Sequence, residues 1–101
     1  MTVKDYVNEI VNNTEDPLWF NSEETLLLAL CSYLKETGED YTNKEDLKEL
    51  LNGVSTGKTD SLIEELEEKK KESEAVKYYK SFNNVSERQK LSIIASLILK
   101  I

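Results

Sequence analysis

The segment Gly53–Thr59 comes nearest to a catalytic motif in this 101-residue sequence. It reads Gly-Val-Ser-Thr-Gly-Lys-Thr and has the general form of a phosphate-binding loop, in which backbone N–H groups, a lysine and a hydroxyl surround phosphates. The motif requires four residues between its two glycines, and here there are three. It should also follow a buried strand, whereas this segment follows a helical stripe of leucines. We therefore interpret it as a loop between two helices and expect no nucleotide binding.

Histidine and cysteine, two residue types common in catalytic sites, are nearly missing from this chain. Histidine, the commonest general base and metal ligand, is absent. The single cysteine, Cys31, ends the apolar run Leu26–Cys31, which is typical of a buried structural thiol. One cysteine cannot form an internal disulfide, which favours a reducing compartment. We predict no catalytic residue, no metal site and no cofactor, and expect that this chain by itself is not an enzyme.

Acidic residues dominate the charge of the chain. Twenty Asp and Glu residues against 13 Lys and Arg residues give a net charge of −7, which argues against binding nucleic acid by its phosphates and favours basic partners. The glutamates of residues 64–68 radiate around a helix and are not expected to converge on a cation. The candidate contacts for a basic protein are acids expected to be exposed on the third and fourth helices: Asp46, Glu49, Glu64, Glu65 and Glu68. Alternatively, these acids only keep a small helical bundle in solution.

A nucleic-acid-binding module is the second hypothesis. It requires five lysines to form one basic face despite the overall charge: Lys69, Lys70, Lys71, Lys77 and Lys80. Aromatic residues could supply a stacking platform for bases, namely Trp19, Phe20, Tyr78, Tyr79 and Phe82. Few basic residues are interleaved with them, so we favour core packing. A third hypothesis is a free-standing helical adaptor or inhibitor protein.

The segment Asp16–Gly38 is predicted to be the central helix. Asp16 suits an N-cap, Pro17 suits the first helical position and Gly38 suits a left-handed end. The apolar run of Leu26–Cys31 covers more than half of the helix circumference, so neighbouring helices must surround it. The run is too short, and too closely followed by charge, to cross a bilayer.

The other predicted helices follow from caps and apolar spacing. We expect a first helix capped by Thr2 and ending near Asn12, and another that begins with a Thr42–Glu45 capping box and ends at Asn52–Gly53. A further helix is expected through Leu62–Leu66, followed by a break near Ser73 and a short helix over Ala75–Phe82. The last helix is expected to run from a Ser86–Gln89 capping box to Ile101. The loop before Leu62 is predicted to cover Val54–Thr59. The expected fold is all-α, a compact bundle of five to six helices around a central hydrophobic helix, as a single domain over residues 1–101.

The two ends of the chain carry further indications. The first residues form a charged amphipathic segment and not a hydrophobic leader, so we expect a soluble cytoplasmic domain. The last helix has apolar residues on nearly every face up to Ile101, with no polar tail. Termini are usually exposed and polar, so we expect a domain excised from a longer chain, or a face covered by a partner.

Three segments together resemble the all-α domain of type IV secretion coupling proteins. In that family an Asp-Pro-Phe-Trp signature precedes an Ala/Leu-rich helix that ends in a Tyr-Leu-like pair, and this chain has Asp16-Pro17-Leu18-Trp19 followed by the apolar helix to Leu34. Residues Ala75–Phe82 match the family's Ala-x-x-Tyr-Tyr-x-x-Phe segment, and Ser86–Leu97 resembles the Ser-Ile-bearing helix after it. The segments occur in the same order and cover nearly the whole chain, with Leu18 in place of the usual Phe.

The resemblance implies a role in conjugation. Coupling proteins are membrane-anchored hexameric motor ATPases that feed relaxase-bound DNA or effector proteins into a secretion channel. Their nucleotide-binding domain carries the phosphate loop, and an inserted helical domain on the cytoplasmic side is implicated in recognising the transfer substrate. This chain would be that inserted domain, with its termini near one another and without direct membrane contact. Its implied partners are a relaxase or accessory DNA-processing protein, the motor domain of its parent chain, and DNA as a further candidate.

Overall fold

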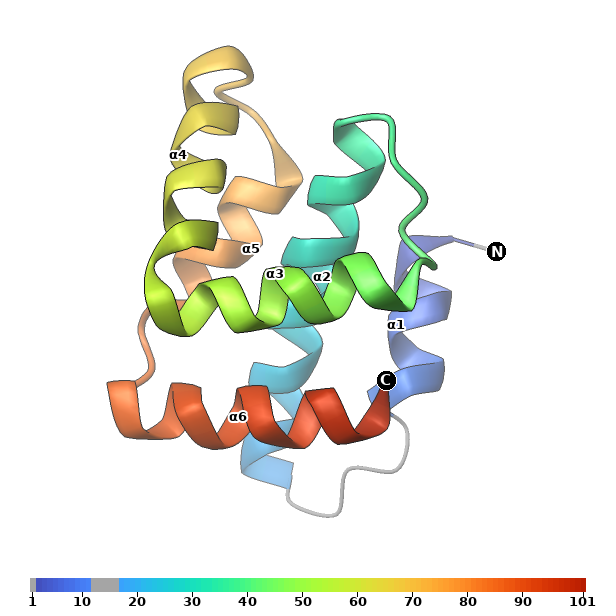
Figure 1. The fold of residues 1–101 in the computed structure, drawn as a ribbon, viewed down its shortest axis with the longest axis vertical. Coiled ribbons are helices and arrows are strands. Elements are labelled where there is room, and N and C mark those ends of the chain that lie inside the picture. The colour runs from blue at the N-terminus through green and yellow to red at the C-terminus, as the bar shows by residue number, and fades with distance from the viewer. Residues whose placement is uncertain (1, 12–16) are drawn as a thin grey trace.

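The computed structural model describes residues 2–11 and 17–101 and, of residues 17–20, the backbone alone. This part of the chain forms six α-helices and no strand. The helices are α1 (Val3–Val11), α2 (Pro17–Glu36), α3 (Lys44–Thr56), α4 (Lys58–Lys69), α5 (Glu74–Phe82) and α6 (Glu87–Lys100) (Figure 1). The predicted all-α bundle is confirmed. None of the described helices combines the length and apolar content that crossing a bilayer requires.

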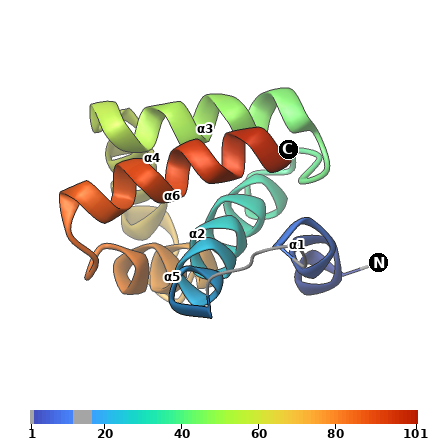
Figure 2. The ribbon, with the colours of Figure 1, turned by 90° about the horizontal axis from the view of Figure 1, so that it is seen from below.

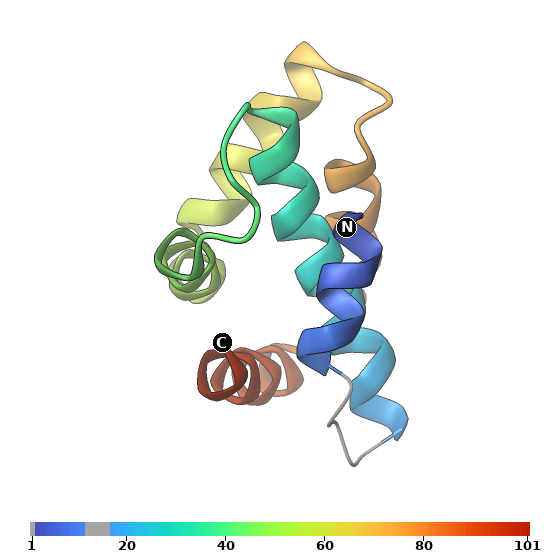
Figure 3. The same ribbon diagram turned by 90° about the vertical axis from the view of Figure 1, so that its right-hand side faces the viewer.

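Helix α2 is the centre of the bundle. It packs against α1, α3, α5 and α6, most extensively against α5. Figure 3 shows α3 and α6 end-on to one side of α2, with α1 and α5 on the other side, and Figure 2 shows α3 and α6 running next to each other. Every residue of Leu26–Cys31 is buried, as a helix enclosed on all sides requires. The prediction that neighbours surround this run is confirmed.

Several predicted helix ends are observed. Thr2 and Asp5 cap α1 reciprocally, because the Asp5 N–H donates to Thr2 Oγ1 at 3.1 Å and the Thr2 N–H to Asp5 Oδ2 at 3.3 Å. Gly38 ends α2 at φ +83°, and the Glu39 N–H donates to the Leu34 carbonyl at 2.8 Å. Ser86 and Gln89 form the predicted capping box of α6. The predicted cap Asp16 and helix end Asn12 lie outside the described residues.

The start of α3 differs from the prediction. Its N-cap is Asn43, whose side-chain oxygen accepts from the N–H groups of Glu45 and Asp46 at 3.1 and 3.2 Å. Thr42 instead donates to Asp40 Oδ1 through its hydroxyl at 2.7 Å and its N–H at 2.9 Å. The predicted Thr42–Glu45 capping box is therefore wrong, because a nearer carboxylate holds Thr42 in the preceding turn.

The end of α3 also differs. The helix continues through Asn52–Gly53 to Thr56, and the predicted loop Val54–Thr59 is reduced to Gly57, at φ +83°. Buried Val54 extends the apolar stripe of the helix. Gly53 serves close packing and does not end the helix, since a Cβ at that position would lie 2.3 Å from Thr59 Oγ1. The glycine lets the start of α4 fold back against α3.

The predicted break near Ser73 is confirmed. The Ser73 hydroxyl oxygen caps α5 by accepting from the Val76 N–H at 3.3 Å. That hydroxyl also donates to Glu36 Oε2 at 2.9 Å, and the Ala75 N–H donates to the same oxygen at 3.3 Å. The carboxylate of Glu36 thereby joins the end of α2 to the start of α5.

Helix α6 places apolar side chains on both its buried and its open sides. Ile93, Ile94 and Leu97 are buried, whereas Leu91 is 59% and Leu99 89% exposed. Ile101 lies with Tyr6 and Ile10 of α1 around a shared hollow, so the C-terminus lies beside the first helix (Figure 1). An origin as an inserted domain stays a prediction.

Candidate functional site

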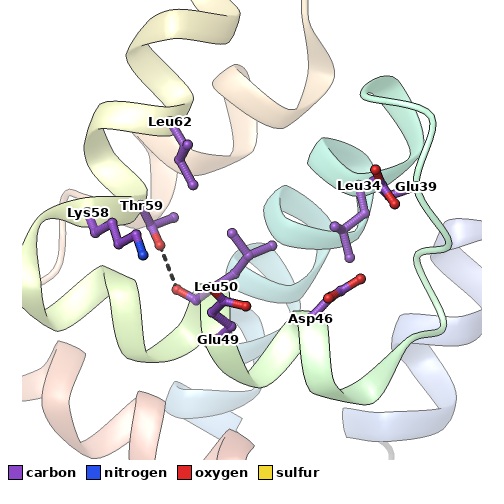
Figure 4. A pocket seen from close by; sticks show the side chains of 8 residues that line it. All are labelled: Leu34, Glu39, Asp46, Glu49, Leu50, Lys58, Thr59 and Leu62. Atoms are coloured by element: carbon purple, nitrogen blue, oxygen red, sulfur yellow. Dashed lines mark hydrogen bonds between the residues drawn. The ribbon is translucent and has the colours of Figure 1, made fainter.

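A pocket opens where the end of α2, the body of α3 and the start of α4 meet (Figure 4). Its volume is about 290 Å³. It is lined by Leu34, Glu39, Asp46, Glu49, Leu50, Lys58, Thr59 and Leu62. Three of these are leucines and four are charged, so the pocket combines an apolar floor with a charged rim.

The apolar floor comes from three different helices. Leu34 lies in the last turns of α2, Leu50 in α3 and Leu62 in α4. Leu34 and Leu50 are buried and Leu62 is half-buried, so each belongs to the edge of the hydrophobic core. The pocket is thus an extension of the core surface, and an apolar group placed in it would lose contact with water.

The rim has three carboxylates and one ammonium group. Figure 4 shows Glu39 and Asp46 near Leu34, and Lys58 on the opposite side of the pocket. Glu49 is one turn further along α3 than Asp46. Within the described residues, none of these four side chains takes part in an ion pair. The rim therefore carries an excess of negative charge that faces the pocket and solvent.

Thr59 has a structural role in this wall. Its side chain is buried, and its hydroxyl donates to the Leu50 carbonyl at 2.7 Å (Figure 4). This bond fixes the first turn of α4 against α3, and the neighbouring Lys58 starts α4 beside the pocket. Lys58 shares its sign with the partial positive charge of the helix N-terminus, so this side of the pocket favours anionic groups.

The structure divides the acids predicted as partner contacts. Asp46 and Glu49 line the pocket together, whereas Glu64 lines a hollow between α4 and α5, and Glu68 another with Lys71 and Lys80. Glu65 lies on the same side of α4 as Leu62, close enough to Tyr33 for its charge to act on that residue. Burial raises the pKa of the Tyr33 hydroxyl, and the negative charge of Glu65 raises it further. Glu39 was not predicted as a contact, although its place directly after the helix-ending Gly38 marks an exposed loop.

The five lysines of the nucleic-acid hypothesis are interleaved with acids. Lys80 forms an ion pair with Glu67 at 2.6 Å, and Lys71 shares a hollow with Glu67 and Glu68. Lys70 donates to the Glu36 carbonyl at 3.4 Å. Lys69 and Lys77 are exposed on α4 and α5. Glutamate side chains therefore lie among these lysines and pair with Lys80, so the lysines face neighbouring negative charge.

Two side chains that can carry covalent or acid–base chemistry, Cys31 and Tyr79, are buried. Cys31 is fully buried, and burial raises its pKa from 9.0 to about 12, so the thiol stays protonated at neutral pH. Tyr79 is also buried and donates its hydroxyl to the Asp60 carboxylate; burial and this bond raise its pKa. Among the described residues, no three His, Cys, Asp or Glu side chains gather as metal ligands would.

The aromatic residues of α5 belong to the core. Tyr79 and Phe82 are buried with their rings 6.5 Å apart, and half-buried Tyr78 packs against the core. The prediction that these residues pack in the core, and do not form a stacking platform for bases, is confirmed for Tyr78, Tyr79 and Phe82. The side chains of Trp19 and Phe20 lie outside the described part of the chain.

Comparison with known proteins adds no relative. No protein-family model, no curated protein and no solved structure matches this chain. The resemblance to coupling proteins therefore rests on the three sequence segments alone.

Proposed function

We propose that this chain is a non-catalytic recognition domain that binds a basic segment of a protein substrate. In the fuller form of the proposal, it belongs to a conjugative type IV secretion coupling protein and selects a relaxase or an accessory DNA-processing protein. The three ordered sequence segments support the family assignment. The pocket supports protein recognition.

The observation that carries the proposal is the acidic rim over a floor of leucines. A lysine or arginine side chain has an aliphatic stem that can cover Leu50 and Leu62, and a cationic head that can reach Asp46 and Glu49. The carboxylates of the rim attract the cationic head, and burying the aliphatic stem against the leucines removes its apolar surface from water. A basic protein segment thus satisfies both parts of the pocket.

Duplex or single-stranded DNA does not fit the acidic rim. Its phosphates would be repelled by the carboxylates of the rim and by the net charge of −7. The lysines that could bind phosphates are mixed with glutamates, as the Lys80–Glu67 ion pair illustrates. Protein recognition is therefore the function we favour.

The test is a titration of the purified chain with a purified conjugative relaxase, with single- and double-stranded DNA, and with both together, at about 50 mM and about 200 mM salt. We expect binding to the relaxase without DNA, weakening as salt rises. The double variant Asp46→Asn/Glu49→Gln should lower the affinity roughly tenfold, since it removes both charges but keeps the side-chain shapes.

The matched control is Glu64→Gln/Glu68→Gln. It removes the same number of charges from exposed positions outside the pocket, and we expect affinity within about twofold of the unmodified chain. Equal losses of relaxase affinity in both double variants would show that binding depends on the overall charge of the chain and not on the pocket. Binding to DNA alone would replace the proposal with the lysine hypothesis, and absence of binding to the relaxase would overturn the family role.

A further inference from the structure

The opposite charges of the pocket stay apart. Elsewhere in the described chain Lys80, Lys90 and Lys100 form ion pairs with glutamates, but Lys58 forms none, although three carboxylates line the same pocket. Leu50 and Leu62 lie between Lys58 and the Glu39–Asp46 side (Figure 4). Leu34 lies next to Glu39, and Glu49 lies beside Leu50. A ligand can therefore meet both signs of charge at different places in the pocket.

The backbone keeps the two sides apart. Asp46 lies in the first turn of α3, and Lys58 follows the helix after the single turn residue Gly57. The path along α3 from Asp46 to Thr56 rises about 15 Å at about 1.5 Å per residue. The Thr59–Leu50 hydrogen bond holds the start of α4 in this position. The separation is thus built into the fold and does not depend on flexible side chains alone.

Resting on the proposed function, we propose that the part of the basic partner segment that enters the pocket is amphoteric, with a cationic, an apolar and an anionic side chain in that spatial order. The cation lies among the carboxylates of Glu39, Asp46 and Glu49, the apolar side chain on Leu34, Leu50 and Leu62, and the anion at Lys58. Lys58 would then reject a segment that is basic throughout, because it places a like charge at one end of the pocket.

The spacing of such a segment follows from the span of the pocket. An extended chain advances about 3.3 Å per residue, so four residues cover about 13 Å and flexible side chains cover the remainder. The matching probe is the peptide Gly-Lys-Ser-Leu-Ser-Glu-Gly, acetylated and amidated so that its termini carry no charge. Three variants replace its Glu by Gln, its Glu by Lys, or its Lys by Gln.

The experiment is an NMR titration of the isotope-labelled chain with each of the four peptides. We expect replacement of Glu by Gln to weaken binding about threefold, and replacement by Lys to weaken it further. In the Lys58→Glu variant the order should reverse, with the Lys-for-Glu peptide the strongest. A glutamate at the first position of α4 suits the helix dipole, so this variant should fold.

The control is Lys77→Glu, which makes the same charge change at an exposed position on α5, outside the pocket, and should keep the original order. If the Glu, Gln and Lys peptides bind equally and Lys58→Glu changes nothing, the amphoteric ligand is wrong while docking of a basic segment stands. If the peptide with Gln in place of its Lys binds as well as the parent, the docking proposal itself is wrong.

Discussion

The carboxylates of this chain differ in what surrounds them. Glu23 is buried and pairs with Lys100 at 2.8 Å, Glu36 accepts from Ser73 and Ala75, and Asp60 accepts from Tyr79. These groups hold the fold together. Glu39, Asp46 and Glu49 share one pocket and, in the described chain, form no ion pair. The residues available for recognition are thus separated from those used for structure.

The stability of the fold should fall above pH 9, and Cys31 should account for part of that fall. The unfolded chain releases the thiol proton near the ordinary pKa of 9.0, whereas the folded chain keeps it up to about 12. Below pH 9 both states are protonated and the contribution is fully present. Deprotonation then stabilises only the unfolded chain, by roughly 1 kcal/mol at a pH of about 10.

Urea unfolding at pH values of about 8 and 10 measures this effect. Cys31→Ala should lose less stability between the two pH values than the unmodified chain, whatever its stability at the lower one. Tyr79, whose pKa is also raised, has an ordinary value of 10.0 and contributes mainly above this window. An identical loss in both chains would contradict the prediction.

At the element scale, the junction of α3 and α4 determines the shape of the pocket. Gly57 alone separates the two helices, and Gly53 allows Thr59 to approach the backbone of α3. The Thr59 hydroxyl satisfies the Leu50 carbonyl in a buried position. This tight turn brings Leu62 and Lys58 of α4 to the same pocket as Asp46 and Glu49 of α3.

Gly53→Ala should therefore destabilise the fold by about 2 kcal/mol, because its Cβ would overlap Thr59 Oγ1. Thr59→Ala should cost about 1 kcal/mol through the lost hydrogen bond to Leu50. The double variant should cost less than the sum of the two, since the closest contact of the new Cβ, 2.3 Å to the Thr59 hydroxyl oxygen, is removed and only the 3.2 Å contact with the Thr59 backbone nitrogen stays tight. Chemical denaturation of the four chains forms the double-mutant cycle, and simple additivity would contradict the packing role of Gly53.

At the scale of the whole molecule, α6 is joined to α2 by an apolar contact and an ion pair. Ile93, Ile94 and Leu97 supply the apolar side, and Lys100 reaches the buried carboxylate of Glu23. The Glu23 side chain is fully buried and that of Lys100 is 21% exposed. The pair links residues 77 positions apart, so it helps to place the last helix across the central one.

Lys100→Met should destabilise the fold by about 3 kcal/mol, because it leaves the buried carboxylate without its cation. Replacing both partners, as Glu23→Met/Lys100→Met, should cost less than Lys100→Met alone, since no buried charge then remains. Thermal and urea unfolding measure both changes. A double variant less stable than Lys100→Met would contradict this account of the pair.

Much of the fold could be predicted from local sequence. The run Leu26–Cys31 required burial on all sides, and the caps at Thr2, Gly38 and Ser86 depend on hydrogen bonds within a few residues, as does the new helix start after the predicted break near Ser73. The errors fell at α3, where two local signals competed. The Thr42 hydroxyl donates to Asp40 instead of capping α3, and Gly53 allows the close approach of Thr59 instead of ending the helix.

The chain by itself determined the all-α class, the central helix, the net charge and the acidity of α3 and α4, because these depend on composition and on contacts between near neighbours. Only the tertiary structure decided which acids lie together. Asp46 and Glu49 join Glu39 and Lys58 around three leucines, whereas Glu64 and Glu68 point elsewhere. The physical reason is that a pocket is built from side chains of several helices, and its shape depends on how those helices cross, here on the close approach of Gly53 and Thr59.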